Sequence, residues 1–409
     1  MTDSCSTPDL LSLEQALVKI LAELPQPNGY EQVSLKESLD RITYQPVNST
    51  INVPGFRNSS MDGYALHSSD HKVNTLKLVG TSWAGEPYTK EVNNGECVRI
   101  FTGAYVPDCC NCVVMQENVS ESDALVKINQ WPTRYENIRN IADDTSKDQE
   151  LLTKGTRLKA ADIGLLASCG VDNIAVFKRL NVGFFSTGDE LRSIGSQLEL
   201  GQIFDSNRYT LHALLTEAGA TPIDMGVIPD NPDDVEKALL SASKYCDVII
   251  TSGGVSVGEA DFITDVLNKI GRIHLWKIAM KPGKPLVFGS IDNTHFFGLP
   301  GNPVSVMINF RQVVLPALKK LMGLKAEQTP LTLQAIASDT ILKQPGRIEF
   351  QRGIAENIKG ALVVKPTGKQ GSHMLSSMSK ANCFIVLEQN SGDIQEGQLV
   401  NIQLLGKSL

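Results

Sequence analysis

Residues 247–303 read DVIITSGGVSVGEADFITDVLNKIGRIHLWKIAMKPGKPLVFGSIDNTHFFGLPGNP and hold three glycine-rich loops. The loops cover 252–262, 281–285 and 299–303, and each follows an apolar run typical of a buried strand (DVII, IHLWKIAM and THFFG). Between the first two loops, residues 261–271 have the pattern of a helix. This alternation predicts a βαβ arrangement, in which ligands bind at the carboxyl ends of the strands.

The same stretch carries groups that suit an anion. Gly253, Gly254 and Gly258 allow backbone N–H groups to converge on a ligand, and Lys281 and Lys284 add positive charge. One such loop more often only makes a turn. Three loops in quick succession, with charges of both signs, favour a phosphate-type site.

Acidic residues recur at the strand ends of this region. Asp189 and Glu190 follow the run NVGFFST, Asp230 follows the next predicted strand, and Asp261 lies in the first glycine-rich loop. Carboxylates would repel a bound anion unless a hard cation such as Mg²⁺ lay between the carboxylates and the anion. The alternatives are that Asp230 only shapes a turn and that Asp261 only caps a helix.

Composition limits the class of protein. The chain has 409 residues, enough for about two to four domains. A net charge of −7 and the lack of a basic block argue against a nucleic-acid partner. No apolar run reaches membrane-spanning length, and the N-terminus lacks a signal-peptide pattern, so we expect a cytoplasmic protein without membrane association. Cys109 and Cys112 form a C-x-x-C without a second pair, so we expect reduced thiols.

Regular patterns extend on both sides of the central stretch. Residues 12–24 have helical periodicity, with a capping box of Ser12 and Gln15. Alternating runs over 73–130 predict an all-β module, and alternation from Thr329 onward predicts a small β-barrel or sandwich. Further helices are expected at 205–219, after Asn231 and after Pro303, the last interrupted by Pro316.

Three further positions have two interpretations each. The loop VPGFRNSSMDGYAL (53–66) is either functional or a packed turn in which Asp62 makes an Asx-type bond. Thr102 lies at a strand end, where it either contacts an anion or belongs to a turn. Arg352 either reaches a neighbouring site or faces solvent from a strand.

Taken together, the motifs resemble the MoeA/gephyrin E-domain family of molybdopterin molybdenumtransferases over nearly the whole chain. No single motif would suffice, but their number, order and spacing are specific. They are VPGFRNSSMDGYA, RIFTGA, FFSTGDEL, DSNRY, TSGGVSVGEADF, KIAMKPGKP, GLPGNPVS, EFQRG and QGSHMLSS.

The resemblance implies an α/β plus β architecture. It places a two-lobed N-terminal region at 1–180, with a β-rich insertion at about 55–140. A central doubly wound α/β domain of the molybdopterin-binding type would span 181–326, and a small β-barrel 327–409. It also implies a homodimer.

The implied activity belongs to molybdenum cofactor biosynthesis. It is Mg²⁺-dependent insertion of molybdate into adenylylated molybdopterin, with release of AMP. Implied partners are other proteins of this biosynthesis and acceptor apoenzymes. The alternatives are a molybdopterin adenylyltransferase, which the TSGGVSVG loop alone would also fit, and a gephyrin-like scaffold.

The resemblance also assigns roles to residues. Asp62, Thr102, Glu190, Asp230 and Asp261 would be the essential polar residues, the last three as Mg²⁺ ligands, and Asp62 would face the α/β domain of the partner subunit. One departure is the segment NIRNIADD, where the family often has NIRRxGED, so that Asn140 and Ala142 replace arginine and glycine. The implied substrate-binding residues are Ser252, Gly253, Gly254, Gly258, Lys277, Lys281, Lys284, Pro300, Pro303, Arg139, Asp144, Arg352 and Ser372.

Overall fold

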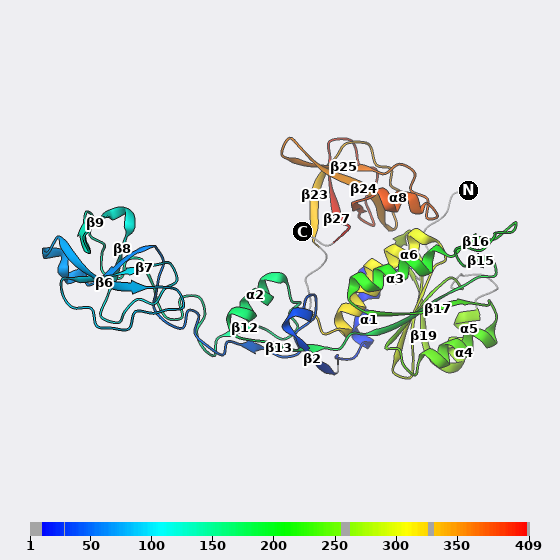
Figure 1. Cartoon of the computed structure of the whole chain (residues 1–409). Coiled ribbons are helices and arrows are strands. Elements are labelled where there is room, and N and C mark those ends of the chain that lie inside the picture. The colour runs from blue at the N-terminus through cyan, green and yellow to red at the C-terminus, as the bar shows by residue number, and fades with distance from the viewer. Residues whose placement is uncertain (1–9, 28, 255–261, 326–330, 407–409) are drawn as a thin grey trace. The chain divides into compact units, whose positions relative to one another are not determined.

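The computed structural model of the chain contains two compact units (Figure 1). The first consists of Met1–Glu31 and Phe177–Leu409, and the second is Gln32–Val176. No helix within the described residues is long and apolar enough to cross a membrane. The structure describes residues 10–27, 29–254, 262–325 and 331–406.

A seven-stranded sheet forms the centre of the first unit, in the order β1-β19-β21-β22-β18-β14-β17. β22, β18, β14 and β17 are parallel neighbours, whereas β21 is antiparallel to both β19 and β22. β19 therefore runs in the same direction as β22 and β18, and all three glycine-rich loops leave the same edge of the sheet. The strands are β1 (Leu10–Leu11), β14 (Asn181–Thr187), β17 (Thr221–Ile228), β18 (Val248–Ser252), β19 (Arg272–Ile278), β21 (Pro285–Ile291) and β22 (Thr294–Leu299).

Helices cover both faces of this sheet, with α4 and α5 on one face and α1, α3 and α6 on the other (Figure 1). Val235 and Leu239 of α4 pack with Ile263 and Leu267 of α5 in a buried cluster that includes Phe185 of the sheet. The prediction of a doubly wound α/β domain is confirmed. The helices are α1 (Leu13–Glu23), α3 (Ser206–Ala218), α4 (Pro232–Ala242), α5 (Phe262–Ile270), α6 (Pro303–Asn309) and α7 (Leu315–Leu321).

Local chemistry sets the ends of these helices, as the sequence predicts. Ser12 and Gln15 form the capping box of α1. Asp205 accepts a hydrogen bond at the start of α3, and Gly219 ends that helix with a φ of 85°. Asn231 caps α4 in the same way.

The long helix after Pro303 is interrupted where the sequence predicts it. Between α6 and α7 the chain forms a π-helical turn, η4 (Phe310–Val314), directly before Pro316. Proline has no N–H to donate to the preceding turn, and its ring excludes the carbonyl that would lie there. The wider turn accommodates both constraints.

The C-terminal strands form a closed five-stranded barrel, because β24 pairs with β26 as well as with β25. A short strand from the α/β region, β20 (Met280–Lys281), adds to β24 from outside. Buried residues such as Val364, Ile385 and Ile402 fill the barrel. Its strands are β23 (Thr332–Ala337), β24 (Ile348–Ile358), β25 (Ala361–Pro366), β26 (Cys383–Leu387) and β27 (Leu399–Leu404), with helix α8 (Leu375–Lys380) between β25 and β26.

The second unit contains a six-stranded sheet in the order β8-β5-β7-β6-β10-β9. Leu66, Leu76 and Val126 lie in its buried core. A smaller core surrounds Leu166 of α2. The sheet strands are β5 (Gly63–Leu66), β6 (Thr75–Ser82), β7 (Glu96–Ile100), β8 (Cys112–Met115), β9 (Val119–Ser122) and β10 (Leu125–Ile128).

Short strand pairs and single turns complete the fold. The pairs are β2 (Tyr30–Ser34) with β13 (Asn173–Phe177), β3 (Val47–Asn48) with β12 (Glu150–Leu152), β4 (Asn58–Ser59) with β11 (Ile138–Arg139), and β15 (Leu191–Arg192) with β16 (Ile203–Phe204). The remaining helical elements are η1 (Leu35–Glu37), η2 (Ser68–Lys72), η3 (Gln116–Asn118) and α2 (Ala160–Ser168).

Strands also form in segments whose composition predicts loops. β4 and β5 both lie within the predicted loop 53–66, and β21 begins at Pro285, the last residue of the predicted loop 281–285. The first residue of β5 is Gly63, and no larger residue fits there, because a Cβ would lie 1.8 Å from the carbonyl oxygen of Val114. A glycine at this point is therefore the signature of close strand packing and not of a turn.

Candidate functional site

Carboxylates gather at one edge of the seven-stranded sheet. Asp189 and Glu190 follow β14, and Asp230 follows the adjacent parallel strand β17. Burial raises the pKa of Asp230, and the negative charges of Asp189 and Glu190 raise it further. Asp189 and Glu190 thus lie close enough to Asp230 for their charges to act on it, at the common strand edge where the sequence places Glu190 and Asp230.

This donor set has the chemistry of a Mg²⁺ site. Carboxylate oxygens are the ligands that Mg²⁺ prefers, and a cation would remove the repulsion that raises the pKa of Asp230. The third predicted ligand, Asp261, lies outside the described residues, as does Gly258. Within the part of the chain that the structure describes, no three Asp, Glu, His or Cys side chains already form a metal-binding group.

The glycine-rich loops lie beside these carboxylates and are linked to the start of α3. Asn207 Nδ2 donates to Ser252 Oγ and to the carbonyl oxygen of Gly301, both at 2.7 Å. The N–H of Gly253 donates to the carbonyl of Leu299 at 3.1 Å. One side chain therefore holds the loop after β18 and the loop after β22 together.

The two described glycines of the first loop lie against β14. Gly253 and Gly254 have φ values of 98° and 67°, and a Cβ on Gly253 would lie 2.7 Å from the carbonyl oxygen of Thr187. Among the described residues, Thr187 Oγ1 and Asn207 Oδ1 are buried and have no hydrogen-bond partner. The loop backbone thus lies directly on the end of β14, and two buried polar atoms beside it lack partners.

The barrel holds Lys281 at this edge. Lys281 Nζ lies 3.2 Å from Oε1 and 3.3 Å from Oε2 of Glu349, a buried carboxylate of β24. Lys277 and Lys284, the other predicted lysines, are exposed, as is half of the Lys281 side chain. Of the three, Lys281 is the one whose position is fixed by a charge pair in the structure.

Arg352 is buried in the barrel, with 1% of its surface exposed. Its Nε donates to Ser377 Oγ at 3.0 Å, and its Nη2 donates to the carbonyl of Gly371 at 3.0 Å. The alternative of a solvent-facing strand residue is therefore wrong. Arg352 organises the segment that carries Ser372, whose carbonyl accepts from the N–H of Val304, next to Pro303.

In the second unit the structure brings Asp62 and Thr102 together. Asp62 Oδ1 accepts from the N–H and from the Oγ1 of Thr102, both at 2.8 Å. These two hydrogen bonds, with the nearby Arg99, lower the pKa of Asp62. Of the two alternatives for this loop, the local Asx-type bond is therefore wrong: Asp62 accepts its hydrogen bonds from Thr102, far along the chain, and its side chain remains exposed.

The divergent segment NIRNIADD lies in the same unit. Arg139 is exposed on β11, opposite Asn58 on β4, and Asp144 is exposed and donates its N–H to Val53. Ala142 has a φ of 64°, a conformation that favours glycine. The positive φ explains why the family pattern has glycine at this position. In this chain an alanine adopts the same conformation.

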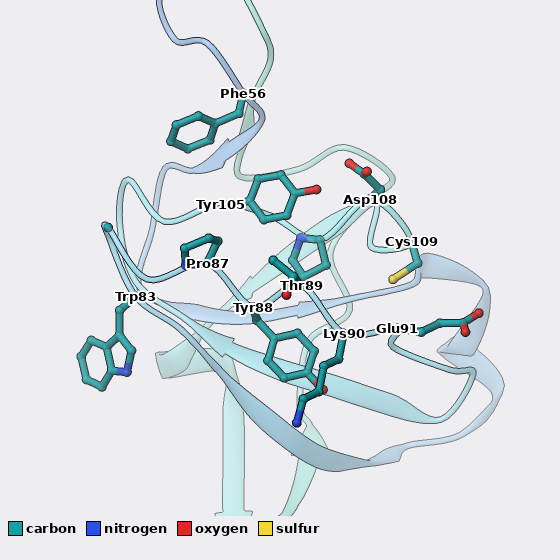
Figure 2. Close-up of a pocket in the computed structure, with 12 residues that line it drawn as sticks. Phe56, Trp83, Pro87, Tyr88, Thr89, Lys90, Glu91, Tyr105, Asp108 and Cys109 are labelled. Carbon is teal, nitrogen blue, oxygen red and sulfur yellow. The ribbon is translucent and has the colours of Figure 1, made fainter.

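The sequence reading missed a pocket of about 600 Å³ in the second unit (Figure 2). The rings of Phe56, Trp83, Tyr88 and Tyr105 line it, together with Pro87 and Pro107. Its walls come from separate segments, which hides it from a local reading. The available signal was the concentration of aromatic residues between 83 and 105.

Comparisons with known proteins cover nearly all of the chain. Three family models match in succession. They are the MoeA N-terminal region (domain I and II) at residues 11–170, the "Probable molybdopterin binding domain" at 183–320, and the MoeA C-terminal region (domain IV) at 334–405.

Whole proteins match over the same length. The chain is 44% identical to the molybdopterin molybdenumtransferase of Haemophilus influenzae, over 96% of this chain and 98% of that one. It is 33% identical to the enzyme of the same name from Nostoc, over 96% and 92%. The crystal structure of the molybdopterin biosynthesis moeA protein from Pyrococcus horikoshii superposes with a TM-score of 0.84 at 27% identity, over 97% of this chain and 100% of that one. Fold and relatives agree, and the chain belongs to the MoeA family of molybdopterin molybdenumtransferases.

Proposed function

We propose that this chain inserts molybdate into adenylylated molybdopterin, with release of AMP, in a Mg²⁺-dependent reaction of molybdenum cofactor biosynthesis. The observation that carries the proposal is the position of Asp189, Glu190 and Asp230 beside a glycine-rich loop, at one edge of the sheet. Carboxylates at strand ends beside a glycine-rich loop are the groups that a Mg²⁺-assisted phosphoanhydride reaction needs.

Different residues at this edge of the seven-stranded sheet would bind the metal ion and the phosphate. Glu190, Asp230 and Asp261 would hold Mg²⁺, whose charge, when bound there, would polarise a phosphoanhydride and so favour loss of AMP. Ser252, Gly253, Gly254 and Gly258 would bind phosphate through the glycine-rich loop. Asn207 supports this role, because it fixes the loop through Ser252.

The molybdate-binding part of the site would be formed by the lysines and by residues of the barrel. Molybdate is a tetrahedral dianion, which suits charged donors in fixed positions. The fixing of Lys281 by Glu349 and of the Ser372 segment by Arg352 supports this assignment. The residues proposed for molybdate are Lys277, Lys281, Lys284, Arg352 and Ser372, with Pro300 and Pro303 shaping the loop between them, and Arg139 and Asp144 are proposed as further substrate contacts.

The assay that tests this function measures AMP release. Purified protein is given adenylylated molybdopterin, molybdate and Mg²⁺, and we expect AMP and molybdenum cofactor to form. Glu190→Ala and Asp261→Ala should abolish Mg²⁺-dependent AMP release while the fold stays intact. Synthesis of the adenylate from ATP would instead identify an adenylyltransferase, and inactivity with retained protein binding would identify a scaffold.

We further propose a cytoplasmic homodimer in which Asp62 of one subunit acts with Glu190 and Asp261 of the other. The exposed carboxylate of Asp62, held ionised by Thr102, supports this role. Asp62→Asn and Glu190→Ala homodimers should each be inactive. Refolding the two variants together should restore roughly a quarter of all sites, because about half of the dimers are mixed and each has one intact site. No recovery in confirmed mixed dimers would exclude a shared site.

The remaining expectations stay proposals. The division into 1–180, 181–326 and 327–409 can be tested by limited proteolysis, which should cut first near these boundaries. Other proteins of molybdenum cofactor biosynthesis, and the apoenzymes that accept the cofactor, are the proposed partners. A pull-down with the tagged full chain would test both groups.

A further inference from the structure

The aromatic pocket of the second unit has the shape of a site for a flat ring. Phe56 and Tyr105 meet edge to face with their ring centres 6.1 Å apart, and Trp83 is 50% exposed at the rim (Figure 2). The ring of Tyr88 packs closely on the backbone of Gly80, where a Cβ would lie only 2.4 Å from the ring. A pocket of about 600 Å³ is within the range of small-molecule sites and is large enough for a bicyclic heterocycle.

Backbone and hydroxyl contacts fix the two loops that form the walls. Ser82 Oγ donates to the carbonyl of Tyr105 at 2.8 Å and accepts from the N–H of Tyr88 at 3.2 Å. Trp83 and Glu86 exchange backbone hydrogen bonds that close a hairpin turn. The rings are therefore held in place before any ligand arrives, which reduces the entropy lost on binding.

The pocket is physically connected to the Asp62–Thr102 pair. Trp83 stacks on Phe101 with ring centres 4.2 Å apart and an angle of 9° between the planes. Phe101 directly precedes Thr102, and the guanidinium carbon of Arg99 lies 5.1 Å from the Phe101 ring centre. A molecule in the pocket would thus lie beside the residues that the family resemblance assigns to the reaction.

We propose that this pocket binds the pterin ring system of the substrate, by stacking on Trp83 and Tyr105 and by a hydrogen-bonded contact to Asp108. The inference rests on the proposed function, because that function supplies a pterin as the ligand. Aromatic faces attract heterocycles of any kind. The selective element is therefore the polar edge of the pocket.

That polar edge favours a pterin over the adenine of the same substrate. The hydroxyl of Tyr105 points toward Asp108 (Figure 2), and burial together with this carboxylate raises the pKa of Tyr105. An ionised carboxylate only accepts hydrogen bonds. The aminopyrimidinone edge of a pterin offers two adjacent donors, its ring N–H and its amino group, whereas adenine offers an amino group flanked by acceptors.

The test measures direct binding and needs no turnover. The full-length protein is titrated with 6-hydroxymethylpterin, a fluorescent pterin, and separately with adenosine, which carries no phosphate. We expect the pterin to bind and adenosine not to compete with it. Trp83→Leu should weaken pterin binding by at least about tenfold, as expected for loss of one stacking partner.

Two matched charge removals test the polar edge. Asp108→Asn should weaken pterin binding by about tenfold or more, the loss expected for a hydrogen bond to a charged group. Glu91→Gln removes the same charge from the same pocket, but this side chain extends away from the rings in Figure 2 and should leave binding unchanged. Both carboxylates are exposed, and the amide that Asp108→Asn introduces can still accept from Tyr105; because Asp108 also lies 3.8 Å from Arg57, the melting temperature of each variant is compared with the wild type to show that folding is unchanged.

The results separate this proposal from the proposed function. Absence of pterin binding, binding that is unaffected by Trp83→Leu, or equal effects of Asp108→Asn and Glu91→Gln would each overturn the pocket assignment. So would displacement of the pterin by adenosine. AMP release by the wild-type protein could persist in all of these cases, because the two measurements are independent.

Discussion

Removal of the Lys281 side chain should destabilise the first unit, because the buried carboxylate of Glu349 would lose its charged partner. Glu349 is 5% exposed, and its pair with Lys281 has an N–O distance of 3.2 Å. At this distance Coulomb's law gives about 1 kcal/mol in water and about 5 kcal/mol at an effective dielectric constant of about 20. Because the lysine side chain is half exposed, we expect Lys281→Met to cost about 2 kcal/mol.

Thermal unfolding followed by calorimetry measures this effect. A loss of about 2 kcal/mol in a unit of this size corresponds to a lower melting temperature by about 4 °C. Glu349→Gln should remove most of the penalty, since the amide has no charge to compensate and can still accept from Gln351, which lies 3.1 Å away. A double-mutant cycle should therefore show a coupling of at least about 1 kcal/mol.

Lys284→Met is the matched control. It removes an exposed lysine from the same loop and should change stability by less than about 0.5 kcal/mol. The reasoning would be refuted if Lys281→Met and Glu349→Gln were additive, or if Lys284→Met were equally destabilising. The outcome also matters for molybdate titrations of Lys281 variants, in which a lost anion contact must be separated from an unpaired carboxylate.

Three other changes test separate parts of the structure. Asp230→Asn should raise the melting temperature at pH 7, because the raised pKa penalises the ionised carboxyl; the gain should vanish as the pH falls below the ordinary value of 3.8, and Mg²⁺ should stabilise the wild type more than the variant. Ala142→Gly should stabilise the second unit by up to about 1 kcal/mol in urea unfolding, since it relieves a φ of 64°, and an unchanged midpoint would contradict this. Gly63→Ala should prevent the six-stranded sheet from forming, with loss of its circular dichroism signal, because its Cβ would lie 1.8 Å from a carbonyl oxygen.

The parts of the fold that depend on local chemistry could be predicted from the sequence. The ends of α3 follow from Asp205 and Gly219, and the interruption before α7 follows from Pro316, because each effect acts within one or two turns. The convergence of Glu190 and Asp230 was predictable for a similar reason, since parallel strands end at a common edge.

The features that were missed depend on partners far along the chain. Gly63 has the composition of a turn, and only the approach of Val114 makes it part of a strand. Arg352 is a charged side chain of a type that usually stays in solvent, but the carbonyl of Gly371 and the hydroxyl of Ser377 accept the hydrogen bonds that allow its burial. No pattern within either segment contains this information.

The pairing of β20 with β24 has a practical consequence for chimeras between relatives. β20 (Met280–Lys281) belongs to the α/β region by sequence but hydrogen-bonds to a strand of the barrel. If the C-terminal barrel of a relative replaced that of this chain, its strand at the position of β24 would have to pair with β20 of this chain. Lys281 would then face the relative's residue at the position of Glu349. The exchangeable module is discontinuous, and a graft should carry the loop 281–285 along with the barrel.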